Sequence, residues 1–531
     1  MMSTGTVRRT IAGFSLVAVV GGLVGCGSTL QSRSTMNGSF GATASAGASQ
    51  STGTQSGTGL GGPAGTSVAQ PGGTASATPG TAGSASSSAT GSGTSGIAPG
   101  TGTGSTPGTT PGADTPVTIP ATGRGWDKMS VYIGVTTQKD VQAAAQSVGA
   151  NGLDAGDQEG QANAMANELN RRGGLFGRQI KIIFHDESTV ATAQDPNTAG
   201  NTACTYYTQD HPVIALLNPV TLMDVPSFRA CMAKAHVPLF SASVAAVDAK
   251  VGQTLAPYFY QSVAPTWDAL APVLVSQLKA QGWFGGWSTV TGSPSKAPTK
   301  IGVLTGSNDV AVRVGALVKN ALAAAGYSDT VVFQYADGST DFSPAVLQFK
   351  GKGVTHVIVV DSSLLPFQLS ANSQKYRPRY GVTSYNAPQT LLESNSPAGQ
   401  LDGGLGTGWS PSLDVSDAND PGDTGPAEPE CKAILAKGGQ TFSGKRLAEA
   451  VAFAFCDGIR LIVQGAAAAG DLTGPGIYRG IQRIASGFST AFSFADGLGP
   501  GRLFVPGAVR DLVFTSGCKC FRYAGSSTYR L

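Results

Sequence analysis

Cysteine and histidine, the residues that most often carry nucleophilic or metal chemistry, are few in this chain of 531 residues, which has seven cysteines and four histidines. His185 and His236 fall at the edges of predicted strands, His211 in a loop and His356 at the start of a strand. None of the four has a second ligand at the spacing typical of zinc sites. The region expected to fold also contains no G-x-S-x-G nucleophile motif. The sequence therefore does not favour an enzyme, and it indicates no metal and no other cofactor.

Hydroxyl side chains follow two predicted strands at the point where each strand ends. Thr221 comes after an apolar run that ends at Leu217, and Ser241 and Ser243 come after one that ends at Phe240. Parallel sheets bind ligands outside the carboxyl ends of their strands, where hydroxyls and free backbone N–H groups can hold the anionic end of a ligand. These three residues are therefore candidate ligand contacts. The alternative is that each hydroxyl caps the helix that follows it.

Other polar side chains end predicted strands elsewhere in the chain and could face the same ligand. One is in the first half and four are in the second half of the folded region: Gln138, Asp361, Ser362, Tyr385 and Asn386. Trp267 follows another predicted strand, and its position suits either ligand contact or packing. We expect the ligand to lie between these residues and the hydroxyls described above.

Acidic residues gather between Gly403 and Glu430, where no basic residue interrupts them. They are Asp414, Asp417, Asp420, Asp423, Glu428 and Glu430. A calcium-binding loop places its ligands at alternate positions, whereas most of these acids are three residues apart. This spacing predicts a solvated acidic loop and not a calcium site.

The element that must position these side chains begins at Val131. Val131–Val135 is a short, β-branched apolar run that predicts a buried strand. In the following segment, Ala162, Met165, Ala166 and Leu169 have the spacing of one helical face, and two glycines at 173–174 can end that helix. A second apolar run over 179–184 predicts another strand. Strand, helix and strand in this order make a βαβ unit, whose strands are parallel.

The alternation of apolar strands and helices continues to the end of the chain. About 400 residues remain from Trp126 onward, which is enough for two domains of ordinary size. The net charge of +3 and the pI near 8.4 are mild, and no basic cluster with interleaved aromatic residues occurs. Nucleic acid is therefore not an expected partner.

The first 125 residues have the composition of a targeting signal followed by a flexible tether. A basic pair, Arg8-Arg9, precedes an apolar stretch that is too short to span a membrane stably, and Leu23-Val24-Gly25-Cys26 is similar to a bacterial lipobox. We expect a signal peptide over 1–25, cleavage before Cys26 and lipidation of its thiol. The segment 26–125 is rich in Gly, Ser, Thr, Ala and Pro and has no apolar periodicity, which predicts a disordered tether. A flexible chain of ~100 residues has an r.m.s. span of roughly 50–60 Å.

The opening βαβ unit resembles a known family. Gly156-Asp157-Gln158-Glu159, the helix that runs into Asn170-Arg171-Arg172-Gly173-Gly174, and Gly177-Arg178 before a strand ending at Asp186 are similar to the start of type I periplasmic binding proteins. The branch that they resemble most is the Leu/Ile/Val-binding and amide-binding group of extracellular solute receptors. The order and spacing of the later elements extend this resemblance over roughly 129–523.

The resemblance implies an α/β fold of two Rossmann-like lobes, with parallel-rich sheets and a hinge of several crossovers, over residues 126–531. Lobe 1 would comprise about 129–262 and 388–480, and lobe 2 about 263–387 and 481–531. With Cys26 lipidated, six cysteines remain, and six allow fifteen pairings. The family often bridges the region of Cys204 and Cys231, so we expect that pair. Bridges Cys431–Cys456 and Cys518–Cys520 are plausible.

The resemblance also implies a function. A monomeric, lipid-anchored protein on the outer face of the cell membrane would capture a small polar solute, an amino acid or an amide-like molecule, by hinge closure and deliver it to an ABC-type permease. Amino-acid binders of this group usually have an acid near the position of Asn386 to hold the ligand's ammonium, and this chain has none there. Either Asp361 replaces that acid, or the ligand has no ammonium. A sensory ectodomain is the main alternative function, and a secreted α/β enzyme is a third.

Overall fold

A computed structural model describes residues 118–531, apart from 148–152, 337–338, 340 and 423–424. The expected signal peptide, Cys26 and most of the expected tether lie outside the described residues. The folded part begins before the expected boundary at 125. Ile119 packs against the core, and the guanidinium of Arg124 donates to the carbonyl of Ala235 at 2.6 Å.

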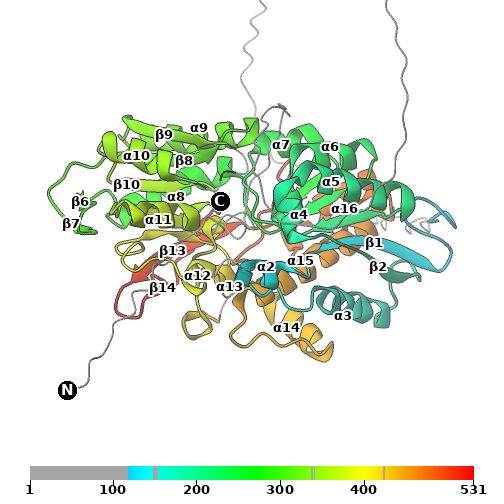
Figure 1. The fold of residues 1–531 in the computed structure, drawn as a ribbon. Coiled ribbons are helices and arrows are strands. Elements are labelled where there is room, and N and C mark those ends of the chain that lie inside the picture. The colour runs from blue at the N-terminus through cyan, green and yellow to red at the C-terminus, as the bar shows by residue number, and fades with distance from the viewer. Residues whose placement is uncertain (1–117, 148–152, 337–338, 340, 423–424) are drawn as a thin grey trace, which may run out of the picture. The chain divides into compact units, whose positions relative to one another are not determined.

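The described residues form two α/β lobes, as the sequence predicted (Figure 1). Lobe 1 contains a parallel sheet with the strand order β2-β1-β3-β4-β5. Its strands are β1 (Ser130–Thr137), β2 (Gln179–Asp186), β3 (Ala215–Asn218), β4 (Leu239–Ser241) and β5 (Phe259–Gln261). Its helical elements are α2 (Val141–Ser147), α3 (Gln158–Arg171), α4 (Thr189–Gln194), α5 (Pro196–Thr205), η2 (Tyr206–Asp210), η3 (Thr221–Met223), α6 (Pro226–Lys234), α7 (Ala249–Leu255), α14 (Glu428–Lys437), α15 (Arg446–Ala469), α16 (Gly474–Ile484) and η6 (Ala485–Gly487).

Lobe 2 contains a larger, mixed sheet with the order β14-β13-β12-β11-β10-β8-β9, in which β13 pairs antiparallel with β12 and β14 and the other neighbours are parallel. Its strands are β8 (Ile301–Gly306), β9 (Thr330–Tyr335), β10 (His356–Val359), β11 (Arg379–Thr383), β12 (Leu405–Gly408), β13 (Ala508–Thr515) and β14 (Cys520–Tyr523), with β15 (Tyr529–Arg530) paired to β13 and a separate hairpin of β6 (Trp287–Ser288) and β7 (Ser293–Pro294). Its helical elements are α8 (Trp267–Ala280), α9 (Asp309–Ala324), α10 (Ser343–Gly351), α11 (Leu364–Ser373), η4 (Ser384–Asn386), α12 (Pro388–Glu393), α13 (Pro411–Asp414) and η5 (Asp417–Asn419).

Three crossovers join the lobes, between β5 and α8, between α13 and α14, and between α16 and β13. The second crossover lies later in the chain than the expected lobe boundary, because β12 pairs with β11 in the sheet of lobe 2. The segment 388–414 therefore belongs to lobe 2 and not to lobe 1. The sequence does not predict strand β12, because Leu-Gly-Thr-Gly has little of the β-branched character that indicates a strand.

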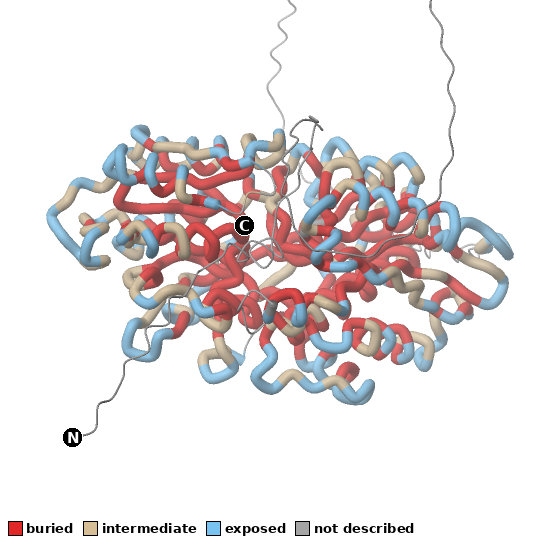
Figure 2. Tube along the Cα trace, in the orientation of Figure 1, coloured by how far each residue is buried: buried red, intermediate tan, exposed pale blue. Residues whose placement is uncertain are grey.

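Helix α15 is the central element of lobe 1. The helix is apolar on most of its surface, and most of its residues are buried. Figure 2 shows that the inner part of each lobe is buried in the same way. Helix α15 is long and apolar enough to cross a membrane by length and composition, but 83% of its apolar window is buried inside the folded unit. At Gly458 a Cβ atom would lie 2.4 Å from Leu217, so the glycine lets the helix lie directly on β3. Gly470 at φ +65° ends the helix.

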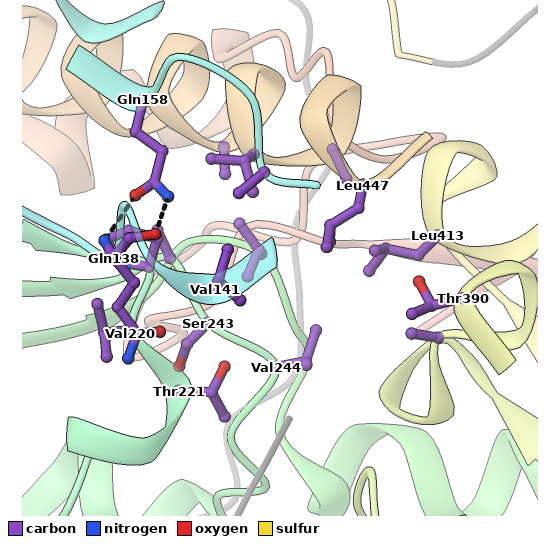
Figure 3. Close-up of a pocket in the computed structure, with 18 of the residues that line it drawn as sticks. Gln138, Val141, Gln158, Val220, Thr221, Ser243, Val244, Thr390, Leu413 and Leu447 are labelled. Carbon is purple, nitrogen blue, oxygen red and sulfur yellow. Dashed lines mark hydrogen bonds between the residues drawn. The ribbon is translucent and has the colours of Figure 1, made fainter. Parts of the chain in front are cut away.

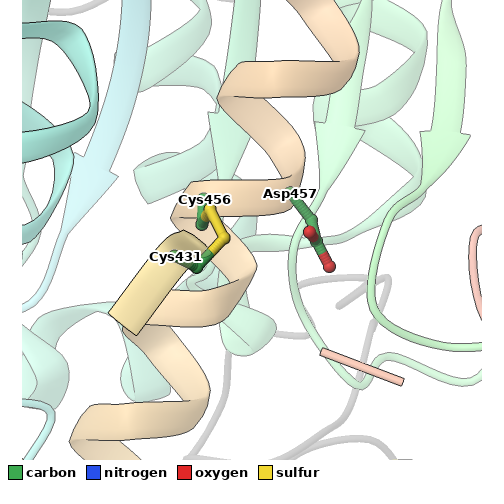
Figure 4. Close-up of side chains that lie close together, drawn as sticks. All are labelled: Cys431, Cys456 and Asp457. Atoms are coloured by element: carbon green, nitrogen blue, oxygen red, sulfur yellow. A yellow bond between two sulfur atoms is a disulfide. The ribbon is translucent and has the colours of Figure 1, made fainter. Parts of the chain in front are cut away.

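The three disulfides in the structure are the same pairs that the sequence suggested, Cys204–Cys231, Cys431–Cys456 and Cys518–Cys520. Their Cα atoms lie 6.3, 6.1 and 5.2 Å apart, within the usual range. Asp457 lies next to the second bridge but points away from it (Figure 4). Its carboxylate accepts from the hydroxyl of Thr490 and from the backbone of the following residues, so this cluster is structural.

The acidic segment between 403 and 430 is not simply a solvated loop, as the sequence had suggested. The guanidinium of Arg446, which is buried, pairs with Asp417, Asp420 and Glu449. These ion pairs attach the second crossover to the first turn of α15. Asp414 is also fully buried, and Asp423 lies outside the described residues.

Candidate functional site

A cavity of about 110 Å³ lies at the carboxyl ends of β1, β3 and β4, where lobe 1 faces lobe 2 (Figure 3). Lobe 1 lines most of it, and lobe 2 contributes Ala387, Thr390 and Leu413. A single water molecule occupies ~30 Å³ in the liquid, so the cavity can hold a small organic molecule. We call it the first cavity.

One side of the first cavity is polar. Three of the residues that the sequence singled out lie together there, Gln138, Thr221 and Ser243 (Figure 3). Gln138 directly follows β1, Thr221 begins η3 after β3, and Ser243 follows β4. The prediction that polar residues at these strand ends would meet is thus realised for this group.

The backbone of Gln138 is held by a residue that the sequence analysis did not select. The side-chain amide of Gln158, the first residue of α3, accepts from the backbone N–H of Gln138 at 3.1 Å and donates to its carbonyl at 3.0 Å. Asp157 caps this helix by accepting from the N–H of Gly160, which fixes the position of Gln158. The position of Gln158 at the start of a helix, directly after a loop near the strand ends, could have indicated its role.

The opposite side of the first cavity is apolar and comes mainly from α15. Leu447, Ala450, Val451 and Ala454 follow the i, i+3, i+4, i+7 spacing of one helical face, and Phe492 adds to them. The sequence predicts that this helix returns the chain to lobe 1, but its pattern does not indicate that the helix lies at the ligand site.

A smaller cavity of about 40 Å³ lies between the same two lobes and has a different character. Asp224 and Arg229 from lobe 1 and Asn308 and Asp361 from lobe 2 line it. We call it the second cavity. Asp224 and Arg229 form a buried ion pair, and Asp224 also accepts hydrogen bonds from the hydroxyls of Ser241 and Ser243.

The other expected ligand residues serve the protein's own interior. Ser241 is fully buried and bonded to Asp224, and it lines neither cavity. Asp361 lines only the second cavity, where it accepts from the hydroxyl of Tyr335 and from the backbone N–H of Ser363. Burial raises the pKa of the Asp361 carboxyl. Ser362 is buried, and its hydroxyl has no hydrogen-bond partner among the described residues.

Tyr385 and Asn386 also lie outside both cavities. Tyr385 is fully buried, stacks on Trp267 with ring centroids 5.2 Å apart, and donates its hydroxyl proton to the carbonyl of Pro265 in the first crossover. Asn386 donates to the carbonyls of Val359 and Asp361. These residues brace the hinge and the end of β10, and Trp267 is a packing residue there.

Comparisons with known proteins agree with this architecture. A family model for periplasmic binding proteins matches residues 130–500. A search of curated proteins finds no match.

Several solved structures share the fold at low sequence identity. One is an ABC-transporter solute-binding protein from R. palustris in complex with 4-hydroxybenzoate, with 15% identity and a TM-score of 0.54 over 75% of this chain and 97% of that chain. A type 1 periplasmic binding protein from Bordetella pertussis Tohama I has 12% identity and a TM-score of 0.53 over 76% and 99% of the two chains. A possible leucine/isoleucine/valine-binding protein from Rhodopirellula baltica SH 1 has 14% identity and a TM-score of 0.51 over 78% and 98%.

The family match covers most of the chain, and the α/β fold with parallel-rich sheets is shared with type I periplasmic binding proteins of known structure. This protein belongs to the periplasmic binding protein family, a family of extracytoplasmic solute receptors.

Proposed function

We propose that this protein captures a small organic solute in the first cavity by closure of its two lobes and delivers it to an ABC-type permease. The observation that carries the proposal is the first cavity itself. It lies where both lobes contribute side chains, so a ligand bound there would be contacted from both sides and would favour the closed arrangement.

The crossover between β5 and α8 is attached to lobe 2 in a way that allows the two lobes to rotate relative to each other. The crossover between β5 and α8 receives hydrogen bonds from lobe 2, because Trp409 donates to the carbonyl of Val263 at 2.8 Å and Tyr385 to that of Pro265. Rigid side chains thus attach the crossover to lobe 2, and rotation would occur at the backbone between these contacts and β5.

The experiment is a thermal-shift screen of the full-length protein in detergent against amino acids, amides, short-chain acids and sugars. Spin labels, one on each lobe, would then report the lobe separation with and without each compound that raises the melting temperature. We expect at least one small solute to stabilise the protein and to narrow the distribution of separations. A ligand that binds without any change in separation would contradict capture by closure.

Delivery to a permease requires a second measurement. The ligand-loaded protein should stimulate ATP hydrolysis by its cognate ABC permease in proteoliposomes, and unloaded protein should stimulate it less. Closure without any stimulation would instead support a sensory ectodomain. We propose that the protein acts as a monomer, which sedimentation at rising concentration would test.

We also propose that the protein is anchored to the outer face of the cell membrane through an acylated Cys26. The motivation is the sequence Leu23-Val24-Gly25 before this cysteine, directly after an apolar stretch. Mass spectrometry of the membrane fraction should find a mature N-terminus at acylated Cys26, and a Cys26→Ala variant should lose the modification. Cleavage at another residue with an unmodified Cys26 would reject the anchor.

A further inference from the structure

We propose that the first cavity selects an uncharged organic molecule with a hydrogen-bond acceptor beside a donor at one end and an apolar body at the other. This inference rests on the proposed function, because it names the kind of solute that the first cavity would capture.

The lining of the first cavity contains no ionisable side chain among the described residues. Its polar members are amides and hydroxyls only: Gln138, Gln158, Thr221, Ser243 and Thr390. A buried ammonium or carboxylate without an opposite charge beside it is strongly disfavoured, since it gives up its hydration without replacement. An amino acid would bring both charges into a site that matches neither.

Gln138 and Ser243 are two of the polar groups that the first cavity offers to a ligand. The side-chain nitrogen of Gln138 is buried and has no hydrogen-bond partner among the described residues. Its backbone is fully occupied by Gln158, so the side chain alone faces the cavity (Figure 3). A buried donor of this kind requires an acceptor, and a ligand carbonyl or hydroxyl oxygen would supply it.

Ser243 presents an acceptor to the ligand and not a donor. Its hydroxyl donates to the carboxylate of Asp224 at 3.0 Å, and a hydroxyl has only one proton to donate. Its oxygen also lies 3.1 Å from that of Ser241, which itself donates to Asp224, and it accepts from the backbone N–H of Ala245 at 3.4 Å. A hydroxyl oxygen has two lone pairs, so one remains that can accept from an N–H or O–H of the ligand. A neutral head group such as a carboxamide offers both an acceptor for Gln138 and a donor for Ser243, whereas a carboxylate has no proton to donate to Ser243.

Two carboxylates that adjoin the first cavity lie outside its lining and hold hydrogen bonds within the protein. Asp224 is paired with Arg229 behind the two serines. Asp414 follows the lining residue Leu413, is fully buried, and accepts from the hydroxyls of Ser384 and Tyr523. Asp224 is therefore not available to an ammonium group in the cavity, and it disfavours an anion on the other side of Ser243; the bonds to Asp414 all go to its Oδ2.

The apolar side determines the shape of the rest of the ligand. The apolar wall consists of the helical face that begins at Leu447, together with Val141, Leu153 and Phe492. It suits a branched or cyclic apolar body of about four to six carbons, and burial of each methylene there would contribute ~0.8 kcal/mol to binding. The cavity volume of about 110 Å³ is consistent with this size.

The test uses four probes with the same apolar body. They are isovaleramide, which is neutral, isovalerate, isopentylamine and leucine; what the four share is the isobutyl group, and the polar group attached to it differs in charge. Calorimetry and thermal shift on the full-length protein should show binding of isovaleramide, and binding of each charged probe should be at least roughly tenfold weaker.

Substitutions in the lining of the first cavity test which side chains bind isovaleramide. Gln138→Leu removes the buried donor and should weaken isovaleramide binding roughly three- to tenfold. Thr221→Val, which keeps the size of the side chain, should weaken it less. The matched control is Gln142→Leu, the same change four residues away at an exposed position of α2, which should leave binding unchanged. The unliganded melting temperature of each variant reports whether it folds.

Equal or tighter binding of leucine, isovalerate or isopentylamine would overturn the inference, and so would the absence of any response to isovaleramide. Unchanged isovaleramide binding in a folded Gln138→Leu variant would overturn it as well. Capture by lobe closure fails on a different observation, an unchanged lobe separation upon binding of whichever solute the screen identifies.

Discussion

The two cavities between the lobes are neighbours and yet opposite in character. The first is lined by apolar side chains, amides and hydroxyls, whereas the second contains Asp224, Arg229 and Asp361. Ser243 connects them, because it lines the first cavity and donates to Asp224 in the second.

The difference separates groups that stabilise the protein from groups that can recognise a ligand. In the second cavity the protein itself supplies the partners of both acids, since Asp224 pairs with Arg229 and accepts from two serines, and Asp361 accepts hydrogen bonds from Tyr335 and Ser363. In the first cavity Gln138 keeps a buried nitrogen without a partner among the described residues. The charged residues, which the sequence makes most conspicuous, are therefore the ones that a ligand is least able to use.

The largest effect is expected from removing the cation of the second cavity. Arg229→Met would leave Asp224 buried without its partner, and breaking a buried ion pair from one side costs ~3–5 kcal/mol. Arg229 also lies over the ring of Phe259 at 5.3 Å, and methionine keeps part of this contact. Equilibrium denaturation in urea should show the loss as a lower midpoint.

The double variant Arg229→Met/Asp224→Asn is the control for this prediction. It removes both charges, so it should recover a substantial part of the lost stability if the unpaired carboxylate is the cause. A double variant as unstable as the single one would show that the cavity depends on packing and not on matched charge.

The next effect concerns Asp414, which directly follows Leu413 in the lining of the first cavity. Burial raises the pKa of the Asp414 carboxyl to about 7, although hydrogen bonds from Tyr523, Ser384 and the backbone N–H of Ser410 lower it in part. In the unfolded chain the carboxyl ionises near pH 4. The favourable contribution of the protonated form is thus fully present below pH ~4 and is lost as the pH rises to about 7, a change of ~2–4 kcal/mol.

Asp414→Asn keeps the group uncharged at every pH and provides the comparison. The free energy of unfolding of the wild type should fall between pH 4 and pH 7 relative to that of the variant, and the two curves should be parallel above pH 8. Curves that stay parallel throughout would mean that Asp414 is ionised in the folded protein, and the first cavity would then have a charge behind Leu413.

Much of the fold follows from local patterns in the sequence. The apolar run at Val131, the helical spacing from Ala162 and the glycines at 173 and 174, which adopt φ of +106° and +69°, predicted the opening βαβ unit. The lobe boundary at 388 was wrong because β12 is short and rich in glycine, and its strand conformation depends on pairing with β11 and β13. Such tertiary contacts leave no trace in the local pattern.

The site was only partly predictable, because a strand's end specifies a place and not a side-chain direction. Gln138, Thr221 and Ser243 line the first cavity, whereas Ser241 does not, although the hydroxyls of both serines bond to Asp224. Tyr385 lies in the short helix η4 and packs on Trp267. The direction of each of these side chains depends on partners that come from distant parts of the chain.

The smallest effect is expected at an ion pair that joins the lobes outside both cavities. Arg313 on α9 of lobe 2 makes two hydrogen bonds to Asp248, the N-cap of α7 in lobe 1, one of them at 3.0 Å. The arginine side chain is 33% exposed, so solvent weakens the pair. Arg313→Met should therefore cost only about 1 kcal/mol of the closed arrangement.

That small cost should appear as weaker ligand binding and not as unfolding. If the pair helps to keep the lobes closed, its loss lowers the closed fraction, and the apparent dissociation constant rises by the same factor, up to roughly fivefold for about 1 kcal/mol. The measurement is calorimetry with the ligand that the screen identifies, together with the spin-label separation in the absence of ligand. Lys319→Met, at an exposed position of the same helix, is the control. If Arg313→Met lowered the midpoint of urea denaturation as far as Arg229→Met, the pair at Asp248 would be part of the core and would not report on closure.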